Sequence, residues 1–192
     1  MPGKVWPHLW NEGRQNLRAG NHTGEFRMKH KSFKNMNCSL AQSMEIVGER
    51  WSLLIIRDVS FGIRRFDDIQ KSLGIARNVL TTRLNRLNEE GILIKTPVDS
   101  GRMEYRLTDK GWDLQPVLLS LTHWGDKYKP HPDGKRLTFV DREFGKPIQR
   151  MAVHAADGRL LKPKEIRARQ GPALKKDAQG KAPKNISLEK RH

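Results

Sequence analysis

At 192 residues, with 37 Lys and Arg against 21 Asp and Glu, the chain can form one domain of typical size plus extensions and carries a formal net charge of +16. No apolar run approaches the roughly 18–20 residues of a membrane-spanning helix, and we see no apolar core of a signal peptide, so we expect a cytoplasmic protein with no membrane partner. Cys38 is the only cysteine, which excludes an intrachain disulfide and a cysteine-based zinc site.

The basic excess lies mainly toward the two ends of the chain. Residues 1–35 carry a formal charge of +5, residues 36–130 only +2, and residues 131–192 carry +9. Residues 1–35 show no sustained hydrophobic period and residues 171–192 are rich in Lys, Gly, Ala and Pro, so both are predicted to be disordered basic extensions. An alternative translation start at Met36 is a further hypothesis. Basic tails suit DNA, RNA and anionic membranes alike, so charge alone identifies no partner.

Two helices are predicted at the start of the folded region, residues 36–130. Ser39 and Gln42 match a capping box, which predicts a helix over 39–47. Gly48 interrupts the pattern, and a second helix is predicted over 49–59 with an apolar face.

The next stretch has the order helix, tight turn, helix. Residues 66–73 place apolar side chains at helical spacing and two Asp residues in the first turn, where negative charge meets the positive end of the helix dipole. Gly74 is predicted to end this helix, because glycine adopts the left-handed conformation easily. A second helix is predicted over 77–90, and Gly91 ends it.

The helix over 77–90 has two opposed faces, one apolar and one made of Asn, Thr and Arg with no acid before Glu89. Such a face approaches phosphates and base edges without repulsion, and helix–turn–helix geometry puts the N-terminal half of this helix in the major groove. The alternative is a polar helix face that contacts only solvent. We predict base contacts from Arg77, Asn78, Thr81 and Thr82, and phosphate contacts from Arg83 and Arg86.

A hairpin follows, with strands predicted over 92–96 and 103–107 and a turn at residues 99–101. Arg102 lies beside the turn glycine, where its side chain can reach a minor groove or a phosphate; the alternative is an ordinary exposed Arg. The whole order is that of a winged helix–turn–helix, which indicates double-stranded DNA as the partner.

Thr108 is predicted to cap a helix that continues to about Tyr128, with Pro116 kinking it or dividing it into two segments. Its wide apolar stripe favours a dimer interface over packing on the same chain, because helix–turn–helix proteins usually bind paired half-sites. Residues 131–170 are predicted to form a small β-hairpin extension with a turn at Asp157-Gly158. The predicted fold class is therefore α+β: a winged helix–turn–helix with extra N- and C-terminal dimerisation helices and a small C-terminal β-hairpin unit.

Taken together, residues 38–128 resemble the HxlR-type winged-helix transcriptional regulators. The matching segments are residues 38–40, 48–58, 65–69, 80–84, 104–108 and 124–125. The resemblance implies a bacterial homodimer whose N- and C-terminal helices build the interface and whose helix from Arg77 reads an inverted-repeat operator. Regulators of this kind often control detoxification or oxidoreductase genes, and some sense electrophiles or oxidants through a cysteine at the position of Cys38.

The chain departs from the family pattern at two places. Ala76 stands where many relatives carry Ser before the reading helix, and since Ala cannot cap, the helix loses roughly 1 kcal/mol of local support. Cysteines found near Phe144 and Ala156 in some relatives are absent here, which excludes a zinc ribbon.

Two roles are open for Cys38. It lies just before a predicted helix N-terminus, where the dipole favours the thiolate, with Arg50 as a possible neighbour, so it is a candidate redox sensor that pairs across the dimer. The alternative is a small hydrophobic residue at the dimer interface.

Nothing in the sequence makes a positive case for an enzyme, a metal site or a cofactor: the seven His residues lack metal-ligand spacing, and no phosphate-binding loop or Ser/His/Asp set is present. Three hypotheses remain. The first is a homodimeric sequence-specific regulator, most simply a repressor. The second is a non-specific architectural or RNA-binding protein driven by its basic tails, and the third is a protein-interaction module.

Overall fold

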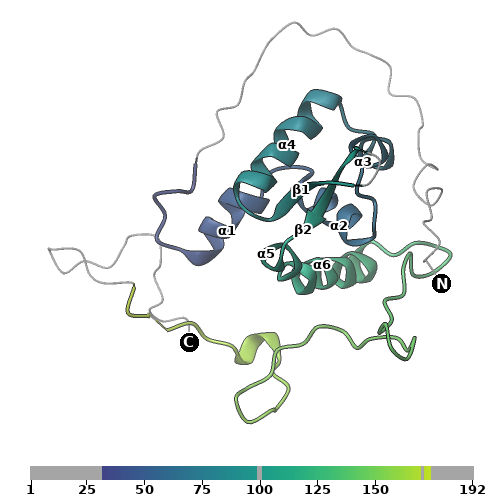
Figure 1. Ribbon diagram of the computed structural model, residues 1–192. Coiled ribbons are helices and arrows are strands. Elements are labelled where there is room, and N and C mark those ends of the chain that lie inside the picture. The colour runs from purple at the N-terminus through teal and green to yellow at the C-terminus, as the bar shows by residue number, and fades with distance from the viewer. Residues whose placement is uncertain (1–31, 99–100, 170, 174–192) are drawn as a thin grey trace, which may run out of the picture. The chain divides into compact units, whose positions relative to one another are not determined.

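The computed structural model describes residues 32–98, 101–169 and 171–173 (Figure 1). In sequence, the chain divides into two compact units between Leu118 and Leu119. The predicted extension over residues 1–35 lies almost entirely outside the described residues, and so does most of the predicted tail over 171–192. Within the described part, no helix is long and apolar enough to cross a membrane.

The first unit is a winged helix–turn–helix, as predicted. In chain order its elements are α1 (Ser39–Val47), α2 (Ser52–Ser60), α3 (Phe66–Leu73), α4 (Arg77–Glu89), β1 (Leu93–Pro97), β2 (Met103–Leu107), α5 (Asp109–Trp112) and the start of α6 (Gln115–Tyr128).

A single apolar core holds these elements together. Its fully buried aliphatic side chains come from α2, α3, α4 and β1 and are Ile55, Ile56, Ile69, Leu80, Leu84, Leu87 and Leu93. Each such side chain stabilises the fold by about 1.5–3 kcal/mol relative to full exposure. The periodicity that predicted α3 and α4 is therefore the periodicity of the core.

The turn between α3 and α4 follows the predicted chemistry. Gly74 adopts the left-handed conformation with φ of 61°, and its N–H donates to the Gln70 carbonyl. The Gln70 side chain donates to the Ile75 carbonyl at 3.2 Å. Ala76 occupies the N-cap position of α4 and makes no side-chain hydrogen bond there, as expected for alanine.

The wing is a two-stranded antiparallel sheet in which Leu93 pairs with Leu107 and Pro97 with Met103. Beyond the strands, the Val98 N–H donates to the Arg102 carbonyl at 2.8 Å; the predicted turn residues 99 and 100 lie outside the described part. The Tyr105 N–H donates to the Arg64 carbonyl and so ties the wing to the α2–α3 loop. Burial of the Tyr105 ring raises the pKa of its hydroxyl above the usual 10.0.

The predicted capping box at the start of α1 is wrong. Cys38, not Ser39, is the N-cap residue, and its side chain makes no cap hydrogen bond. The Gln42 amide instead donates to backbone carbonyls of the preceding segment, the shortest at 2.7 Å to Met36. The side chain that the motif assigned to capping thus anchors residues 33–36 on α1.

The second helix begins later than predicted, at Ser52 rather than at residue 49. Trp51 lies in the left-handed region with φ of 83°, which ends any helical run through it. The helix continues through Ser60, close to the predicted end.

Pro116 divides the predicted C-terminal helix into α5 and α6, as one of the two expected outcomes. Thr108 is the N-cap of α5, and its hydroxyl accepts from the Gly111 N–H at 3.2 Å, as predicted. The apolar stripe of this region splits: Leu114 and Leu118 pack against the core, whereas other members of the stripe are exposed. These exposed residues are Val117, Leu121 and Trp124.

In the second unit, residues from Lys129 to the end of the described part are irregular. The predicted turn at Asp157-Gly158 is present, with Gly158 at φ of 84° and the Ala155 N–H donating to the Arg159 carbonyl at 2.8 Å. An isolated antiparallel bridge joins His154 and Leu160 across this turn, so the expected hairpin is present in a minimal form. The described residues of the extension otherwise show isolated bridges and one short 3-10 helix (Pro163–Glu165), without extended strands. None of residues 131–169 is buried, and without a core a sheet lacks the packing that stabilises it.

Gly111 provides a test of the packing between α5 and the wing. A Cβ at this position would collide with the Ile92 carbonyl oxygen and with a methyl group of Leu107. We expect Gly111→Ala to lower the free energy of unfolding by about 1–3 kcal/mol, measured by thermal or urea denaturation. The matched control is Gly125→Ala in α6, where a Cβ meets nothing within 4 Å and helix propensity predicts a small gain in stability. Equal effects of the two substitutions would contradict this assignment.

Candidate nucleic-acid interface

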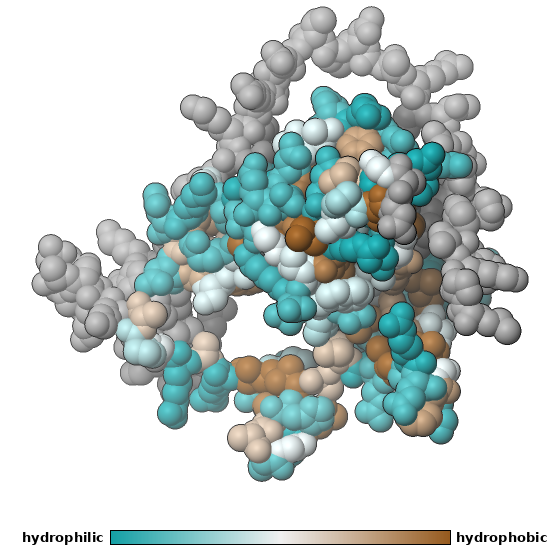
Figure 2. Space-filling model, viewed as in Figure 1, coloured by the Kyte–Doolittle hydropathy of each residue, from teal (hydrophilic) through white to brown (hydrophobic). Residues whose placement is uncertain are grey.

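The exposed face of α4 is set by the residues that α4 buries. Leu80, Leu84 and Leu87 have no exposed surface, and this fixes the rotation of the helix about its axis. On the opposite side Asn78, Thr81, Thr82 and Asn85 are exposed, and Arg77 is exposed at the flank of this face. Four of these five are the predicted base contacts Arg77, Asn78, Thr81 and Thr82. The surface over this part of the molecule is mostly hydrophilic (Figure 2).

The hydroxyl groups of this face are already oriented by the helix. Thr81 donates to the Arg77 carbonyl and Thr82 to the Asn78 carbonyl, each at 2.9 Å. Both hydroxyl protons are therefore already hydrogen-bonded. The hydroxyl oxygens can still accept from base amino groups, and the threonine methyl groups can contact a thymine methyl.

Arg77, the first residue of α4, is in contact with α3. Its guanidinium lies 4.6 Å from the centre of the Phe66 ring, and Nη1 lies 3.5 Å from the Asp67 carboxylate. Neither contact is predictable from the sequence of one helix alone, because each joins α4 to α3.

The two predicted phosphate contacts, Arg83 and Arg86, are engaged in ion pairs. Arg83 Nη2 lies 2.7 Å from Glu49, which precedes α2, and Arg86 Nη2 lies 2.7 Å from Glu90. The Arg86 pair has the i,i+4 spacing and was visible in the sequence; the Arg83 pair joins residues 34 positions apart and was not. Phosphate binding by either residue requires that its present partner is exchanged or shared.

A polar groove of about 520 Å³ runs between α1 and the C-terminal half of α4. Its lining contains both cationic and acidic side chains and comprises Lys34, Glu45, Glu49, Thr82, Arg83, Asn85, Arg86 and Glu89. The acids of this groove lower the positive potential over the C-terminal half of α4, so this half is the less suited to phosphates.

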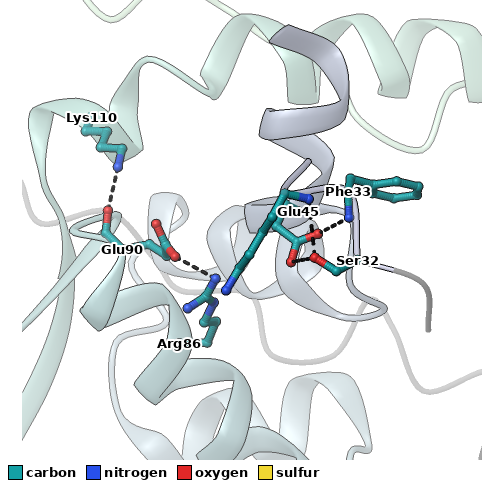
Figure 3. Close-up of polar contacts among 7 residues, drawn as sticks. Ser32, Phe33, Glu45, Arg86, Glu90 and Lys110 are labelled. Carbon is teal, nitrogen blue, oxygen red and sulfur yellow. Dashed lines mark hydrogen bonds and ion pairs between the residues drawn. The ribbon is translucent and has the colours of Figure 1, made fainter. Parts of the chain in front are cut away.

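Glu45 anchors the segment before α1 (Figure 3). Its carboxylate accepts from the Phe33 N–H at 2.7 Å and from the Ser32 hydroxyl at 3.0 Å. These two bonds, helped by the positive charges of Lys34 and Arg86, lower the pKa of Glu45 below its usual 4.5. Figure 3 also shows the Arg86–Glu90 pair and the Lys110 ammonium, which donates to the Glu90 carbonyl at 2.6 Å.

The wing presents a further cationic side chain. Arg102 is exposed and makes no ion pair with another described residue, whereas Arg106 on β2 lies 3.0 Å from Glu104. Arg102 is thus the predicted cation whose charge is least compensated by described acids.

Cys38 is partly exposed at the N-cap position of α1, and its backbone carbonyl accepts from the Gln42 N–H. Arg50, the neighbour suggested by the sequence, stacks on the ring of Trp51 at 5.2 Å. Among the described residues no Cys38–Arg50 contact is found. Nor does the described part bring three or more His, Cys, Asp or Glu side chains together as a metal site would require.

Comparison with known proteins gives a consistent result. Residues 46–133 match the family model of the HxlR-like helix-turn-helix. The uncharacterized HTH-type transcriptional regulator Rv3095 of Mycobacterium tuberculosis is 36% identical over 139 residues, which cover 71% of this chain and 88% of that protein. The HTH-type transcriptional regulator YodB of Bacillus subtilis is 33% identical over 101 residues, 49% of this chain and 88% of YodB.

Solved structures agree with these sequence matches. The crystal structure of PA1607, described as a candidate transcription factor, is 40% identical, covers 73% of this chain and 100% of its own, and superposes with a TM-score of 0.68. A second candidate transcription factor, PA1374 of Pseudomonas aeruginosa, is 40% identical, covers 71% of this chain and 94% of its own, and has a TM-score of 0.50.

The Glu45 anchor makes a pH-dependent prediction. A lowered folded-state pKa means that the contact contributes stability above pH 4.5, and that this contribution is lost as the pH falls through the lowered value. We expect the NMR chemical shift of the Phe33 amide proton to titrate with a midpoint below 4.5, and Glu45→Gln to abolish that titration. Glu89→Gln, in the same groove, is the control and leaves it intact. A midpoint at or above 4.5 would contradict the anchor.

The different pairing of the arginines predicts different salt dependences of DNA binding. Each phosphate that a cationic side chain neutralises contributes about 0.9 to the magnitude of the negative slope of log K against log salt. We expect Arg102→Ala to lower this slope by about one per protomer, and Arg86→Ala to lower it by less, because Glu90 already compensates Arg86. Fluorescence anisotropy over a salt series measures both slopes. Equal losses would mean that Arg86 leaves Glu90 and binds phosphate.

Proposed function

Since this chain belongs to the HxlR-like helix-turn-helix family of transcriptional regulators, we propose that it is a homodimeric, sequence-specific repressor that binds an inverted-repeat operator in double-stranded DNA. Its place of action would be the cytoplasm, where bacterial DNA lies. The proposal rests on one observation about α4. The side chains of Arg77, Asn78, Thr81 and Thr82 are exposed, whereas the leucines on the other side of this helix are fully buried.

The roles of the site residues follow from helix–turn–helix docking, in which the N-terminal half of the second helix enters the major groove. Arg77, Asn78, Thr81 and Thr82 would read base edges, and Arg102 on the wing would reach a phosphate or the minor groove. Arg83 and Arg86 would serve as secondary phosphate contacts, using donors that Glu49 and Glu90 leave free.

Exposed apolar side chains support the dimer. On α1, Leu40 is 69% exposed and Met44 39%; on α6, Leu121 is 50% exposed and Trp124 60%. If two copies of the chain bury these side chains against each other, apolar surface is removed from water and the dimer is stabilised. The family resemblance assigns the interface to these same N- and C-terminal helices, and a two-fold dimer matches an inverted repeat.

The family resemblance also suggests detoxification or oxidoreductase genes as targets and a thiol as the trigger. Cys38 is partly exposed at the start of α1, a helix assigned here to the dimer interface, so its oxidation would act on dimer geometry. The competing role, a small hydrophobic residue in that interface, predicts no response to oxidants.

The second candidate is a non-specific architectural protein driven by basic tails. It is favoured by the charges of +5 over residues 1–35 and +9 over residues 131–192. The two candidates differ in their response to competitor DNA and to salt, because tail-driven binding is nearly all counterion release.

The test is selection of bound duplexes from a random library, followed by fluorescence anisotropy on the enriched sequence with excess competitor DNA at near-physiological salt. We expect an inverted repeat bound at least 1,000-fold more tightly than random DNA. The measurement is then repeated after treatment with a thiol oxidant, with Cys38→Ser as the matched control. Loss of binding in the wild type alone assigns the sensor role to Cys38. No enriched sequence would refute the regulator and favour the architectural alternative.

A further inference from the structure

Two side chains of α3 hold Arg77 at the point where α4 begins. The guanidinium carbon lies 4.6 Å from the centre of the Phe66 ring, so the cation stacks on an aromatic face. On its edge, Nη1 lies 3.5 Å from the Asp67 carboxylate. Phe66 and Asp67 form the first turn of α3, so the two helices of the helix–turn–helix meet at this side chain.

Stability does not account for this arrangement. The side chains of Arg77 and Asp67 are 72% and 85% exposed, and exposed ion pairs contribute little to folding. The two contacts instead restrict the conformational freedom of the Arg77 side chain. A long side chain loses less entropy on binding when its planar end is already held in one orientation.

The contacts also bias the type of acceptor that Arg77 prefers. The Asp67 carboxylate partly cancels the charge of the guanidinium, which weakens its attraction to a phosphate. The donors that do not face Asp67 keep their fork geometry, and that fork matches the O6 and N7 acceptors of guanine in the major groove. For a phosphate contact, the loss of charge attraction offsets the benefit of a fixed orientation; for a base, the orientation is the larger benefit.

We propose that Phe66 and Asp67 are positioning residues that orient Arg77 to read a guanine in each half-site of the operator. This inference rests on the proposed function and narrows it: a guanine lies opposite the start of α4. Phe66 supplies the stacking face, Asp67 fixes the rotation of the guanidinium about that face, and the base receives two hydrogen bonds from one side chain.

The test uses the full-length protein and the operator found by selection. Each operator guanine is replaced in turn by 7-deazaguanine, which lacks the N7 acceptor, and binding is measured by fluorescence anisotropy. We expect one position in each half-site at which replacement of the guanine lowers the affinity of the protein for the operator by about 10- to 100-fold. Arg77→Ala abolishes that difference, and Arg77→Lys retains little of it, because Lys has no fork.

The positioning role is tested with Asp67→Asn and its matched control Asp68→Asn, which removes the same charge from the same turn of the same helix. Asp67→Asn is expected to reduce discrimination at that one guanine at least threefold, whereas Asp68→Asn leaves it unchanged. Phe66→Leu is expected to act like Asp67→Asn. Since Phe66 also packs against the core, its variant is used only if its melting temperature shows a folded protein.

Three outcomes separate the possibilities. If Asp67→Asn and Asp68→Asn both tighten binding to all sequences equally, Asp67 merely repels phosphates and the inference is overturned. If an operator is enriched but Arg77→Ala weakens binding to every base variant uniformly, Arg77 contacts phosphate and only this inference fails. If no sequence is enriched, the proposed function itself fails.

Discussion

The burial of one side of α4 is the constraint on which the rest of the site depends. Leu80, Leu84 and Leu87 recur at helical spacing and are completely buried. A helix turns by about 100° per residue, so a slip of one position would expose these leucines and bury polar side chains. The energy that holds the core together is therefore the same energy that presents Asn78, Thr81 and Thr82 to the outside.

The C-terminal end of α4 is held by a different set of contacts, made by the chain that follows the wing. Lys110 donates to the Glu90 carbonyl, and the Thr108 hydroxyl donates to the Gly91 carbonyl at 2.6 Å. These bonds satisfy carbonyl groups that a helix end leaves without partners. They accompany the close approach of α5 to the Ile92 carbonyl, just before β1, which only a glycine at position 111 permits. The segment after the wing and the end of α4 are thus joined by side-chain donors and backbone carbonyls.

Sequence reasoning succeeded where the physics is local and periodic. The bounds of α3 and α4, the left-handed Gly74, the capping Thr108 and the two strands of the wing all follow from spacing and turn chemistry within a few residues. It failed where a side chain has a choice of partners. Gln42 fits a capping box, yet its side-chain amide donates to backbone carbonyls of the preceding segment instead.

Two other misses have the same origin in distant contacts. Trp51 is a bulky residue in a conformation that only its surroundings can impose, so no local rule predicts it. The hairpin signal at Asp157-Gly158 was correct as a turn, but strands need a core to pack on, and residues 131–169 bury nothing. In the site, the helix face was predictable, whereas the partners of Arg77 and Arg83 were not, because they come from other elements.

The acids around α4 are distributed unevenly, and their positions favour one end of this helix for the proposed contact with DNA. The C-terminal half is bordered by Glu45, Glu49, Glu89 and Glu90, which line the groove toward α1 or pair with its arginines. Near the N-terminal half, the acid that the described part of the chain pairs with α4 is Asp67, which contacts Arg77. A duplex that lay along the whole of α4 would meet repulsion over half its length. One that meets α4 at its N-terminal end avoids those acids, so the charges favour the same docking geometry that the buried leucines allow.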